Sequence, residues 1–184
     1  IYNGQHCPIS LTNTTFVRNT AVSGAALSHK YLPIPTILNS IFWGNISGNI
    51  FKSGIQDRFD NLESNWLTKV LVNGIAEQYP GDPNAKEEVY VKKCNILQGW
   101  NGDERAINQN PLFSDINDLD GPDDKWFTSD DGLRLQSQSP AIDAGYDSNY
   151  SQNYDIAGYL RRQGNSTDIG AYEFGDLKVP IYSV

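Results

Sequence analysis

The chain has 184 residues, of which 39% are hydrophobic and 11% aromatic, so a packed core is expected rather than wholesale disorder. Acidic residues outnumber basic ones 22 to 14, and the net charge of -8 argues against a nucleic-acid partner and against docking onto anionic lipid. The longest apolar runs are short and broken, so no membrane insertion is expected within this chain.

The first residues carry neither the basic stretch nor the apolar stretch of a signal peptide. The chain begins at Ile1 and contains no methionine, and we expect further sequence upstream, where any signal peptide would lie. Two cysteines, Cys7 and Cys94, are too few for a disulfide framework. They either pair in an oxidising compartment or form two separate buried thiols, and the sequence leaves both alternatives open.

Short strands are predicted along the first half of the chain, because helical periodicity is nearly absent and apolar stretches alternate with Asn, Gly, Asp and Ser clusters. Three of these stretches align, at residues 13–19 (NTTFVRN), 39–45 (NSIFWGN) and 94–100 (CNILQGW). The interval from position 13 to position 39 is a plausible length for one turn of a solenoid. The interval from position 39 to position 94 is about twice as long, which predicts two turns or one turn with a long insertion.

A stack of parallel turns explains why such stretches repeat. Equivalent residues of successive turns lie about 4.8 Å apart, so Asn side chains at a repeated bend can hydrogen-bond from turn to turn. Asn and Gly also tolerate the left-handed backbone that such bends require. One turn cannot bury its apolar face alone, so about three or more are needed.

The predicted rhythm breaks at about residues 51–88. This interval contains a strong turn signal at 79–84 (YPGDPN) and a charged run at 86–88 (KEE). Insertions of this kind in solenoids emerge as loops on one face, often the binding face. A solvated excursion without function is the other interpretation.

Five motifs follow in the second half of the chain, at residues 110–113 (NPLF), 132–136 (GLRLQ), 139–145 (SPAIDAG), 155–161 (DIAGYLR) and 168–174 (DIGAYEF). This succession resembles the C-terminal end of secreted bacterial proteins that form a right-handed parallel β-helix. The likeness extends over most of the chain and is weakest at 51–88.

The resemblance implies an all-β fold, a right-handed parallel β-helix or solenoid. Residues 1–109 would form its final coils, with the loop insertion at about 51–88. Residues 110–184 would form a C-terminal cap region that contains an acidic loop at 115–131. Members of this family are exported, so the resemblance also implies an extracellular or bacterial cell-surface location.

The acidic loop is a candidate metal site. It holds seven aspartates, opposed only by Lys125, and so many like charges must be solvated or neutralised by a cation. Oxygen ligands of this kind suit Ca²⁺, which makes calcium the candidate cofactor. The proposed ligands are Asp118, Asp120, Asp123, Asp130 and Asp131.

The EF-hand template does not fit this loop. With Gly121 at the sixth position, Ile116 falls at the first and Phe127 at the twelfth, where a carboxylate is required. A calcium loop of another kind and a solvated acidic loop without a ligand both remain open.

A second set of charged residues follows in the tail. It comprises Asp143, Asp155, Arg161, Asp168 and Glu173. A carboxylate pair acting on a glycosidic bond would need two of these acids as acid and base. We instead predict a hydrogen-bonded structural cap, because the open end of a solenoid must be covered.

Aromatic side chains provide candidate ligand-binding groups, since tyrosine and tryptophan offer an apolar face with a polar tip. The tryptophan candidates are Trp43, Trp66, Trp100 and Trp126, of which Trp43 could equally pack between coils. The tyrosine-rich tail segment is the stronger candidate, with Tyr146, Tyr150, Tyr154 and Tyr159 as its predicted ligand-binding residues.

The function predicted from these features is that of a non-catalytic surface protein, an adhesin or a glycan-binding scaffold, whose partner is an extracellular polysaccharide or another surface protein. The two histidines, His6 and His29, form no metal-spaced pair. The alternative is the C-terminal part of a carbohydrate-active enzyme, such as a polysaccharide lyase, with its active site on upstream coils. A purely structural role in a larger secreted assembly is the third hypothesis.

Overall fold

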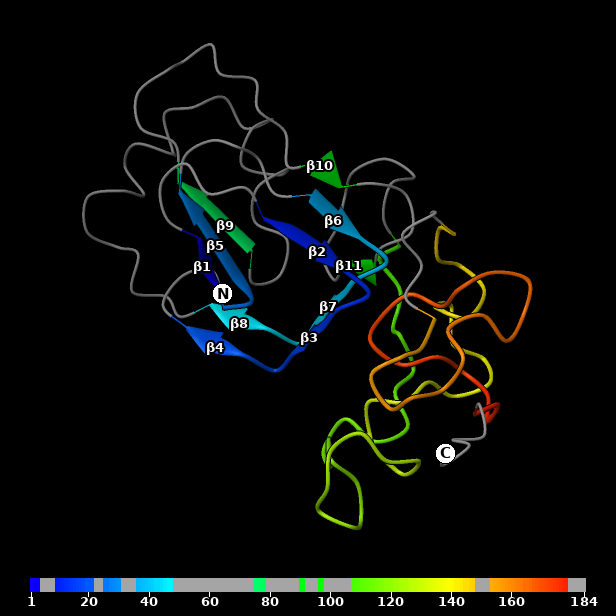
Figure 1. Ribbon diagram of the computed structural model, residues 1–184. Coiled ribbons are helices and arrows are strands. Elements are labelled where there is room, and N and C mark those ends of the chain that lie inside the picture. The colour runs from blue at the N-terminus through cyan, green and yellow to red at the C-terminus, as the bar shows by residue number, and fades with distance from the viewer. Residues whose placement is uncertain are drawn as a thin grey trace, which may run out of the picture.

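The computed structural model describes residues 1–3, 9–21, 25–30, 36–47, 75–78, 90–91, 96–97, 107–147 and 153–178 (Figure 1). Over these ranges the regular secondary structure consists of short β-strands without a helix. The predicted all-β character is therefore confirmed for the described residues. Within the same ranges, no helix is found that could cross a membrane.

Eleven short strands lie among the described residues between positions 2 and 97. They are β1 (Tyr2–Asn3), β2 (Ser10–Thr12), β3 (Thr15–Val17), β4 (Thr20–Ala21), β5 (Leu27–Lys30), β6 (Thr36–Leu38), β7 (Ile41–Trp43), β8 (Ile46–Ser47), β9 (Ile75–Gln78), β10 (Tyr90–Val91) and β11 (Ile96–Leu97). The three-stranded sheets have the orders β1-β5-β9, β10-β6-β2 and β11-β7-β3, and β4 pairs with β8.

All these pairings are parallel. Strands β1 to β4 form a first layer and strands β5 to β8 a second layer, and the pairs between the two layers share one register. The partners in this register are 26 residues apart, as are the hydrogen-bonded side chains of Thr14 and Ser40. The aligned pairs are Tyr2 with Ser28, Ser10 with Thr36, Thr15 with Ile41, and Thr20 with Ile46. Four described strand pairs therefore share one constant register. The interval predicted from the stretches that begin at positions 13 and 39 is the observed pairing register.

A third layer pairs with the second over longer intervals. Leu27 aligns with Ile75, and Ile41 aligns with Ile96. The second of these alignments has the same spacing as the predicted alignment of the stretches that begin at positions 39 and 94. Strand β9 lies inside the interval 51–88 and continues the sheet of β5, while the rest of that interval lies outside the described residues, as do Cys7 and Cys94.

The repeated corners have the left-handed backbone that the Asn and Gly positions predict. Asn13 and Asn39 have φ values of 53° and 49°, and Gly44 has 64°. Arg18, which is equivalent to Gly44, has a φ of 52° although an arginine disfavours this region by about 1 kcal/mol. Its guanidinium donates a hydrogen bond of 2.7 Å to the carbonyl of Ile116, which holds it in place.

Side chains at equivalent positions form ladders between the first two layers. The backbone N–H and Nδ2 of Asn19 donate to Oδ1 of Asn45 at 3.1 and 2.9 Å. Asn45 Nδ2 in turn donates to the Phe16 carbonyl at 2.9 Å. The rings of Phe16 and Phe42 stack with their centroids 4.8 Å apart. The asparagine ladder is therefore part of what sets the register.

Replacing Asn45 with alanine is expected to destabilise the fold by about 1–3 kcal/mol, because the part-buried hydrogen bonds of its buried side chain to the Asn19 N–H and the Phe16 carbonyl are both lost. Asn19→Ala is the matched control, since it removes only the Nδ2 contact of a side chain that is exposed. Urea denaturation of both variants measures the difference. An equal loss in the free energy of unfolding for the two variants would show that the ladder does not depend on the buried Asn45.

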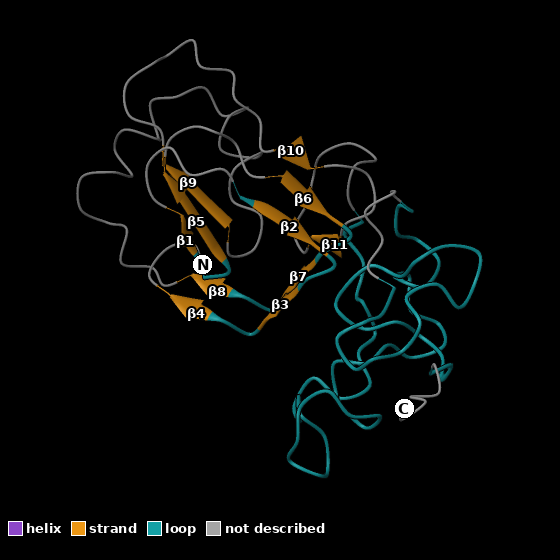
Figure 2. Cartoon of the chain, in the orientation of Figure 1, coloured by secondary structure: helices purple, strands orange, loops and turns teal. Residues whose placement is uncertain are grey.

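The strands of different sheets, drawn in orange in Figure 2, share one hydrophobic core. Leu11, Leu27, Ile37 and Phe42 come from β2, β5, β6 and β7 and pack together as buried residues. Because neighbouring residues of a strand point to opposite faces, Phe42 points into this core while Ile41 faces outward. The outward face of β3 and β7 is therefore left for another part of the chain to cover.

That cover is supplied by residues 107–147 and 153–178, which lie beside β3 and β7 in Figure 1. These residues contain turns and three isolated antiparallel bridges, with no longer strand within the ranges described. Their core consists of Phe113, Leu133, Leu135, Ala141, Ile169 and Tyr172, together with Ile41 of β7. The apolar residues of this region therefore pack against the outer face of β3 and β7.

Gly170 makes a close approach between the two parts. Its φ is 114°, and a Cβ atom there would lie 2.7 Å from Cδ1 of Ile41, so only glycine fits. Its N–H donates to the carbonyl of Asn39 at 2.9 Å. Asn39 also holds Tyr146, accepting its N–H at 2.7 Å and donating to its carbonyl at 3.0 Å. A corner of the strand region is thereby tied to a residue 107 positions further along the chain.

Candidate functional site

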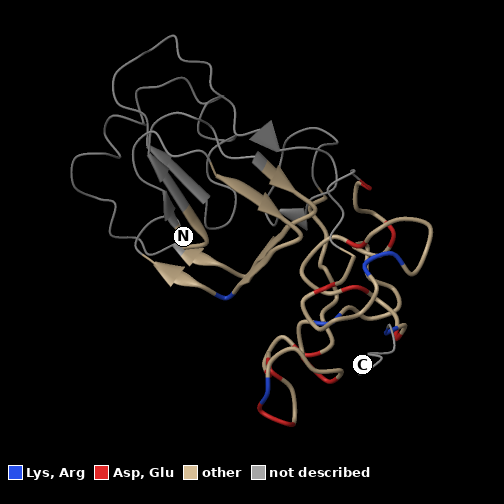
Figure 3. Cartoon of the chain, in the orientation of Figure 1, with Lys and Arg blue, Asp and Glu red and all other residues tan. Residues whose placement is uncertain are grey.

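The charged side chains of the described residues gather in the C-terminal region, as Figure 3 shows. The described strands contribute few charges, and Arg18 lies at a corner between two of them. Most described groups that could take part in acid–base or ionic chemistry therefore lie within residues 107–147 and 153–178.

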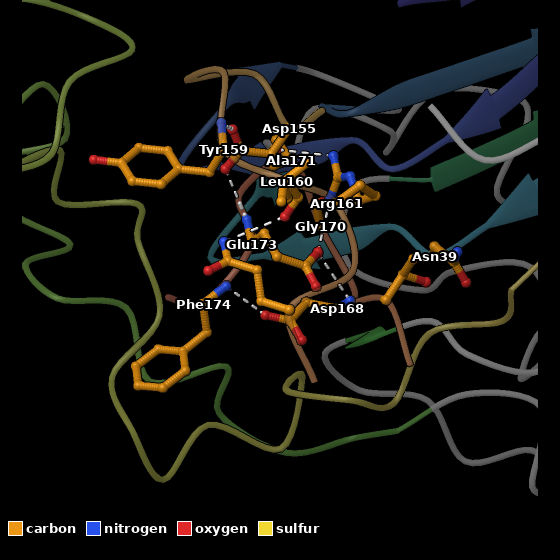
Figure 4. Close-up of polar contacts among 12 residues, drawn as sticks. Asn39, Asp155, Tyr159, Leu160, Arg161, Asp168, Gly170, Ala171, Glu173 and Phe174 are labelled. Carbon is orange, nitrogen blue, oxygen red and sulfur yellow. Dashed lines mark hydrogen bonds and ion pairs between the residues drawn. The ribbon is translucent and has the colours of Figure 1, made fainter. Parts of the chain in front are cut away.

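Arg161 is the centre of a buried polar network (Figure 4). Its guanidinium donates to the carbonyls of Gly170 and Ala171 at 2.9 and 3.0 Å. Nη1 lies 3.7 Å from Oε2 of Glu173. Burial lowers the pKa of Arg161, and the surrounding carboxylates act in the opposite direction. One arginine thus organises the segment 168–174 by contacts with both backbone and side chain.

Asp155 holds two turns of backbone together. Its Oδ1 accepts the N–H groups of Ala157 and Tyr159 at 2.9 and 2.8 Å. Its Oδ2 accepts the N–H of Glu173 at 2.9 Å. A carboxylate that accepts three backbone hydrogen bonds acts as a fixed anchor for the chain.

Asp168 and Glu173 are only 2% and 1% exposed. Asp168 accepts the N–H groups of Asp143 and Phe174 at 2.8 and 2.6 Å, and its own N–H donates to Glu173 at 3.2 Å. Burial raises the pKa of Asp168 to about 6. Burial, and after it the charge of Asp168, raises the pKa of Glu173 to about 8.

This geometry supports the structural interpretation of the acidic set in the tail. A glycosidic bond could not reach two acids that are almost fully buried, and both oxygens of Asp168 are occupied by backbone donors. Asp143 belongs to the same arrangement, because its Oδ1 accepts the N–H of Ser166 at 3.0 Å. The sequence indicated these residues but not which of them would be buried.

The acidic loop does not assemble the predicted calcium ligands. In the part of the chain that the structure describes, which includes all five aspartates, no group of three or more acidic, histidine or cysteine side chains is placed to hold a metal ion. Desolvation and then the charges of Asp120 and Asp115 raise the pKa of Asp118. Asp123 instead accepts the N–H of Lys125 at 2.9 Å, as in a local turn. The side chains therefore do not fit the predicted site.

Asp131 has a different role from the one predicted. It is completely buried and accepts the N–H groups of Phe127 and Thr128 at 2.7 and 3.1 Å, as well as the hydroxyl of Tyr172. Burial acts to raise the pKa of Asp131, but the hydrogen bonds from Tyr172 and Thr128 outweigh it and lower the pKa. Asp131 therefore anchors the loop to the body of the protein.

The predicted tyrosine set is divided. Tyr146 and Tyr154 are exposed and lie where a ligand could contact their rings. Tyr159 is buried, with the guanidinium of Arg134 4.3 Å and the ammonium of Lys178 4.2 Å from its ring centroid. Tyr150 lies outside the described residues, as do Trp66 and Trp100. Among the described members of the set, Tyr159 therefore offers no exposed ring to a ligand, in contrast to Tyr146 and Tyr154.

A polar hollow of about 430 Å³ lies on the C-terminal region. Its lining includes Ser114, Ser129, Asp130, Arg134, Phe174 and Asp176. Phe174 is exposed, whereas Arg134 is held by a 2.9 Å hydrogen bond to the carbonyl of Gly175. The hollow thus combines an accessible aromatic ring with hydroxyl and carboxylate groups.

Sequence reasoning did not identify this hollow. Its residues come from four separate stretches around 114, 130, 134 and 175, which are joined only by tertiary contacts. Arg134 and Phe174 stand within the motifs at 132–136 and 168–174, where neither spacing nor charge distinguishes them.

The sequence matches no protein-family model and no curated protein, and the structure matches no solved structure.

Proposed function

We propose that this chain is the C-terminal portion of a secreted or cell-surface bacterial protein, a right-handed parallel β-helix that acts as a non-catalytic adhesin or glycan-binding scaffold. The fold part of this proposal is supported by the constant register of the first two layers, the shared core and the asparagine and phenylalanine ladders. The location is supported by the resemblance of the tail motifs to exported proteins.

The polar hollow is the observation that carries the binding role. Sugar rings are recognised by an aromatic face together with a few hydrogen-bonding groups, and the hollow offers Phe174 with Ser114, Ser129, Asp130 and Asp176. The Thr128 hydroxyl lies 2.7 Å from Asp130 and 2.8 Å from Asp131, so its one proton can be donated to either carboxylate. The exposed carboxylate of Asp130 is therefore left with acceptor capacity for a ligand hydroxyl.

Binding is tested with a panel of neutral and acidic polysaccharides in affinity electrophoresis, followed by calorimetry with oligomers of any glycan that is retained. Phe174→Ala is expected to weaken binding about ten-fold, which corresponds to about 1.4 kcal/mol, because the stacking face is lost. Ile46→Ala, which also removes an exposed apolar side chain but on β8, is the matched control and should bind like the parent.

Two further variants, Tyr146→Ala and Tyr154→Ala, test whether the exposed tyrosines form the binding surface instead. A loss confined to these variants would move the site away from the hollow. A panel from which no glycan is retained would contradict the binding role. Release of reducing or unsaturated ends from any polysaccharide would favour the carbohydrate-active enzyme over the scaffold.

A further inference from the structure

A second hollow, of about 380 Å³, is lined by strand β3 and by the C-terminal region. Phe16 and Val17 line it on the strand side, and Leu119, Trp126 and Ile156 are among its residues on the other side. Its lining is mostly apolar, in contrast to that of the polar hollow described above. The volume is that of a site for a small molecule, so the hollow suits a compact ligand with an apolar surface.

Aromatic rings from three separate segments meet at this hollow. Its lining includes Phe16, the neighbours Trp126 and Phe127, and Tyr172. Trp126 and Phe127 are 47% and 52% exposed, and Ile156 beside them is 48% exposed. The face of an aromatic ring carries partial negative charge and attracts a cation, most strongly in tryptophan. The apolar lining can therefore favour a ligand that is positively charged.

The loop backbone that carries the two exposed rings is fixed by buried contacts. Phe127 has a φ of 70°, which is strained for an aromatic residue. Its N–H donates to the buried carboxylate of Asp131 at 2.7 Å, and Asp131 also accepts the hydroxyl of Tyr172. Strained backbone of this kind is concentrated at active sites and ligand-binding sites.

Carboxylates stand next to the lining residues of the acidic loop. Asp118 and Asp120 flank Leu119, and Asp124 precedes Trp126 by two positions. The pKa of Asp118 is raised by desolvation and then by the charges of neighbouring aspartates, of which that of Asp120 acts most strongly. These carboxylates therefore repel one another, and a positive charge in the hollow would reduce the repulsion.

The nearby basic side chains have other partners. The guanidinium of Arg18 donates to the carbonyl of Ile116 at 2.7 Å. The ammonium of Lys125 lies 3.9 Å from Asp123, and its side chain is 74% exposed. Neither basic residue belongs to the lining of the hollow, which contains no lysine or arginine among the described residues. A cationic ligand would thus complement both the rings and the aspartates.

We propose that this hollow binds a small organic cation whose ammonium group carries methyl or other alkyl substituents. The alkyl groups contact Trp126, Phe127 and Ile156, while the charge is stabilised by the ring faces and by the field of the aspartates. A metal ion would gain nothing from the apolar lining, and a neutral sugar would gain nothing from the charge. The inference concerns a different hollow from the proposed glycan site and does not depend on that role.

The test uses radiolabelled choline as the probe and the full chain in equilibrium dialysis at low salt. The competitor is the uncharged carbon isostere of choline, in which a tert-butyl group replaces the trimethylammonium group. Choline is expected to bind at least about ten-fold more tightly than this alcohol. Phosphocholine should bind more weakly than choline, since the aspartates repel its phosphate. No saturable choline binding, or equal affinity for choline and the alcohol, would overturn the proposal.

Trp126→Leu keeps an exposed apolar side chain but removes the aromatic face. The affinity for choline is expected to fall about ten-fold. Tyr146→Leu is the matched control, since Tyr146 is an exposed aromatic residue that lines neither hollow, and it should bind choline like the parent. Parent-like binding by Trp126→Leu would overturn the proposal.

Two charge variants test the aspartates with effects of opposite sign. Asp118→Asn is expected to weaken choline binding about two- to three-fold, and Lys125→Gln to strengthen it by a similar factor. Both changes should shrink at high salt, which screens exposed charges. If neither variant changed the affinity, or if a neutral oligosaccharide displaced choline from the parent, the assignment of a cation site would be wrong.

Discussion

Replacing Arg161 with methionine is expected to lower the free energy of unfolding by about 3–5 kcal/mol, as removal of one partner from a buried ionic network does. The carbonyls of Gly170 and Ala171 would lose their donors. The buried carboxylate of Asp168 and the carboxyl group of Glu173, which lies 3.7 Å from the guanidinium, would lose their cationic neighbour. Urea denaturation near neutral pH measures the loss, with the m-value showing whether the variant unfolds in one transition.

Arg162→Met is the matched control for this prediction, since it changes the neighbouring residue in the same way. Arg162 is exposed, lies 3.2 Å from Asp147 and donates to the carbonyl of Asn165. Exposed pairs of this kind contribute about 1 kcal/mol or less. If Arg161→Met were no more destabilising than Arg162→Met, the network would not be a source of stability.

A second large change in the free energy of unfolding is expected when the pH is raised. The pKa values of Asp168 and Glu173 are raised in the fold to about 6 and about 8, so the folded protein retains protons that the unfolded chain has released. Stability must then fall as pH rises. The contribution is fully present below about pH 4 and is lost as pH passes through about 6 and about 8. Since one pKa unit corresponds to about 1.4 kcal/mol, and Asp168 contributes about one unit and Glu173 about three over this range, we expect a loss on the order of 5 kcal/mol between pH 5 and pH 9.

Glu173→Gln provides the control for the pH profile, because the amide resembles the protonated acid and carries no charge. The variant is expected to show a shallower loss of stability above pH 7 and to exceed the parent at pH 9. Asp131 has the opposite linkage: its pKa is lowered, so its contribution is lost only in acid below about pH 4. If the parent chain were equally stable at pH 5 and pH 9, the prediction that folded Asp168 and Glu173 retain their protons would be wrong.

Much of the strand region could be predicted because repetition leaves a record in the sequence. Asn13 and Asn39 occupy equivalent corners with left-handed backbone, and the residues that stack are alike, as Phe16 and Phe42 show. The insertion was harder to place, since its residues do not repeat. Strand β9, inside the predicted interval, continues the sheet of β5 with few of the features of the other repeats.

The acidic loop shows where sequence reasoning fails. Asp118 and Asp131 are both aspartates in one charged stretch, and composition treats them alike. Only Asp131 is buried, because Tyr172, 41 residues away, and the neighbouring backbone supply donors for its carboxylate. Ligand chemistry suggested a shared cation, whereas tertiary contacts gave Asp131 a structural role.

The repeat interval of the first two layers, the corner positions and the all-β character follow from the sequence by itself, because strands that pair in parallel register favour like residues at like places. Tertiary structure alone decided which carboxylates are buried, where the hollows lie and which face of β3 and β7 is covered. These properties depend on contacts such as that of Asn39 with Tyr146, 107 residues apart. Nothing in local spacing specifies such a contact, since burial is determined by neighbours in space.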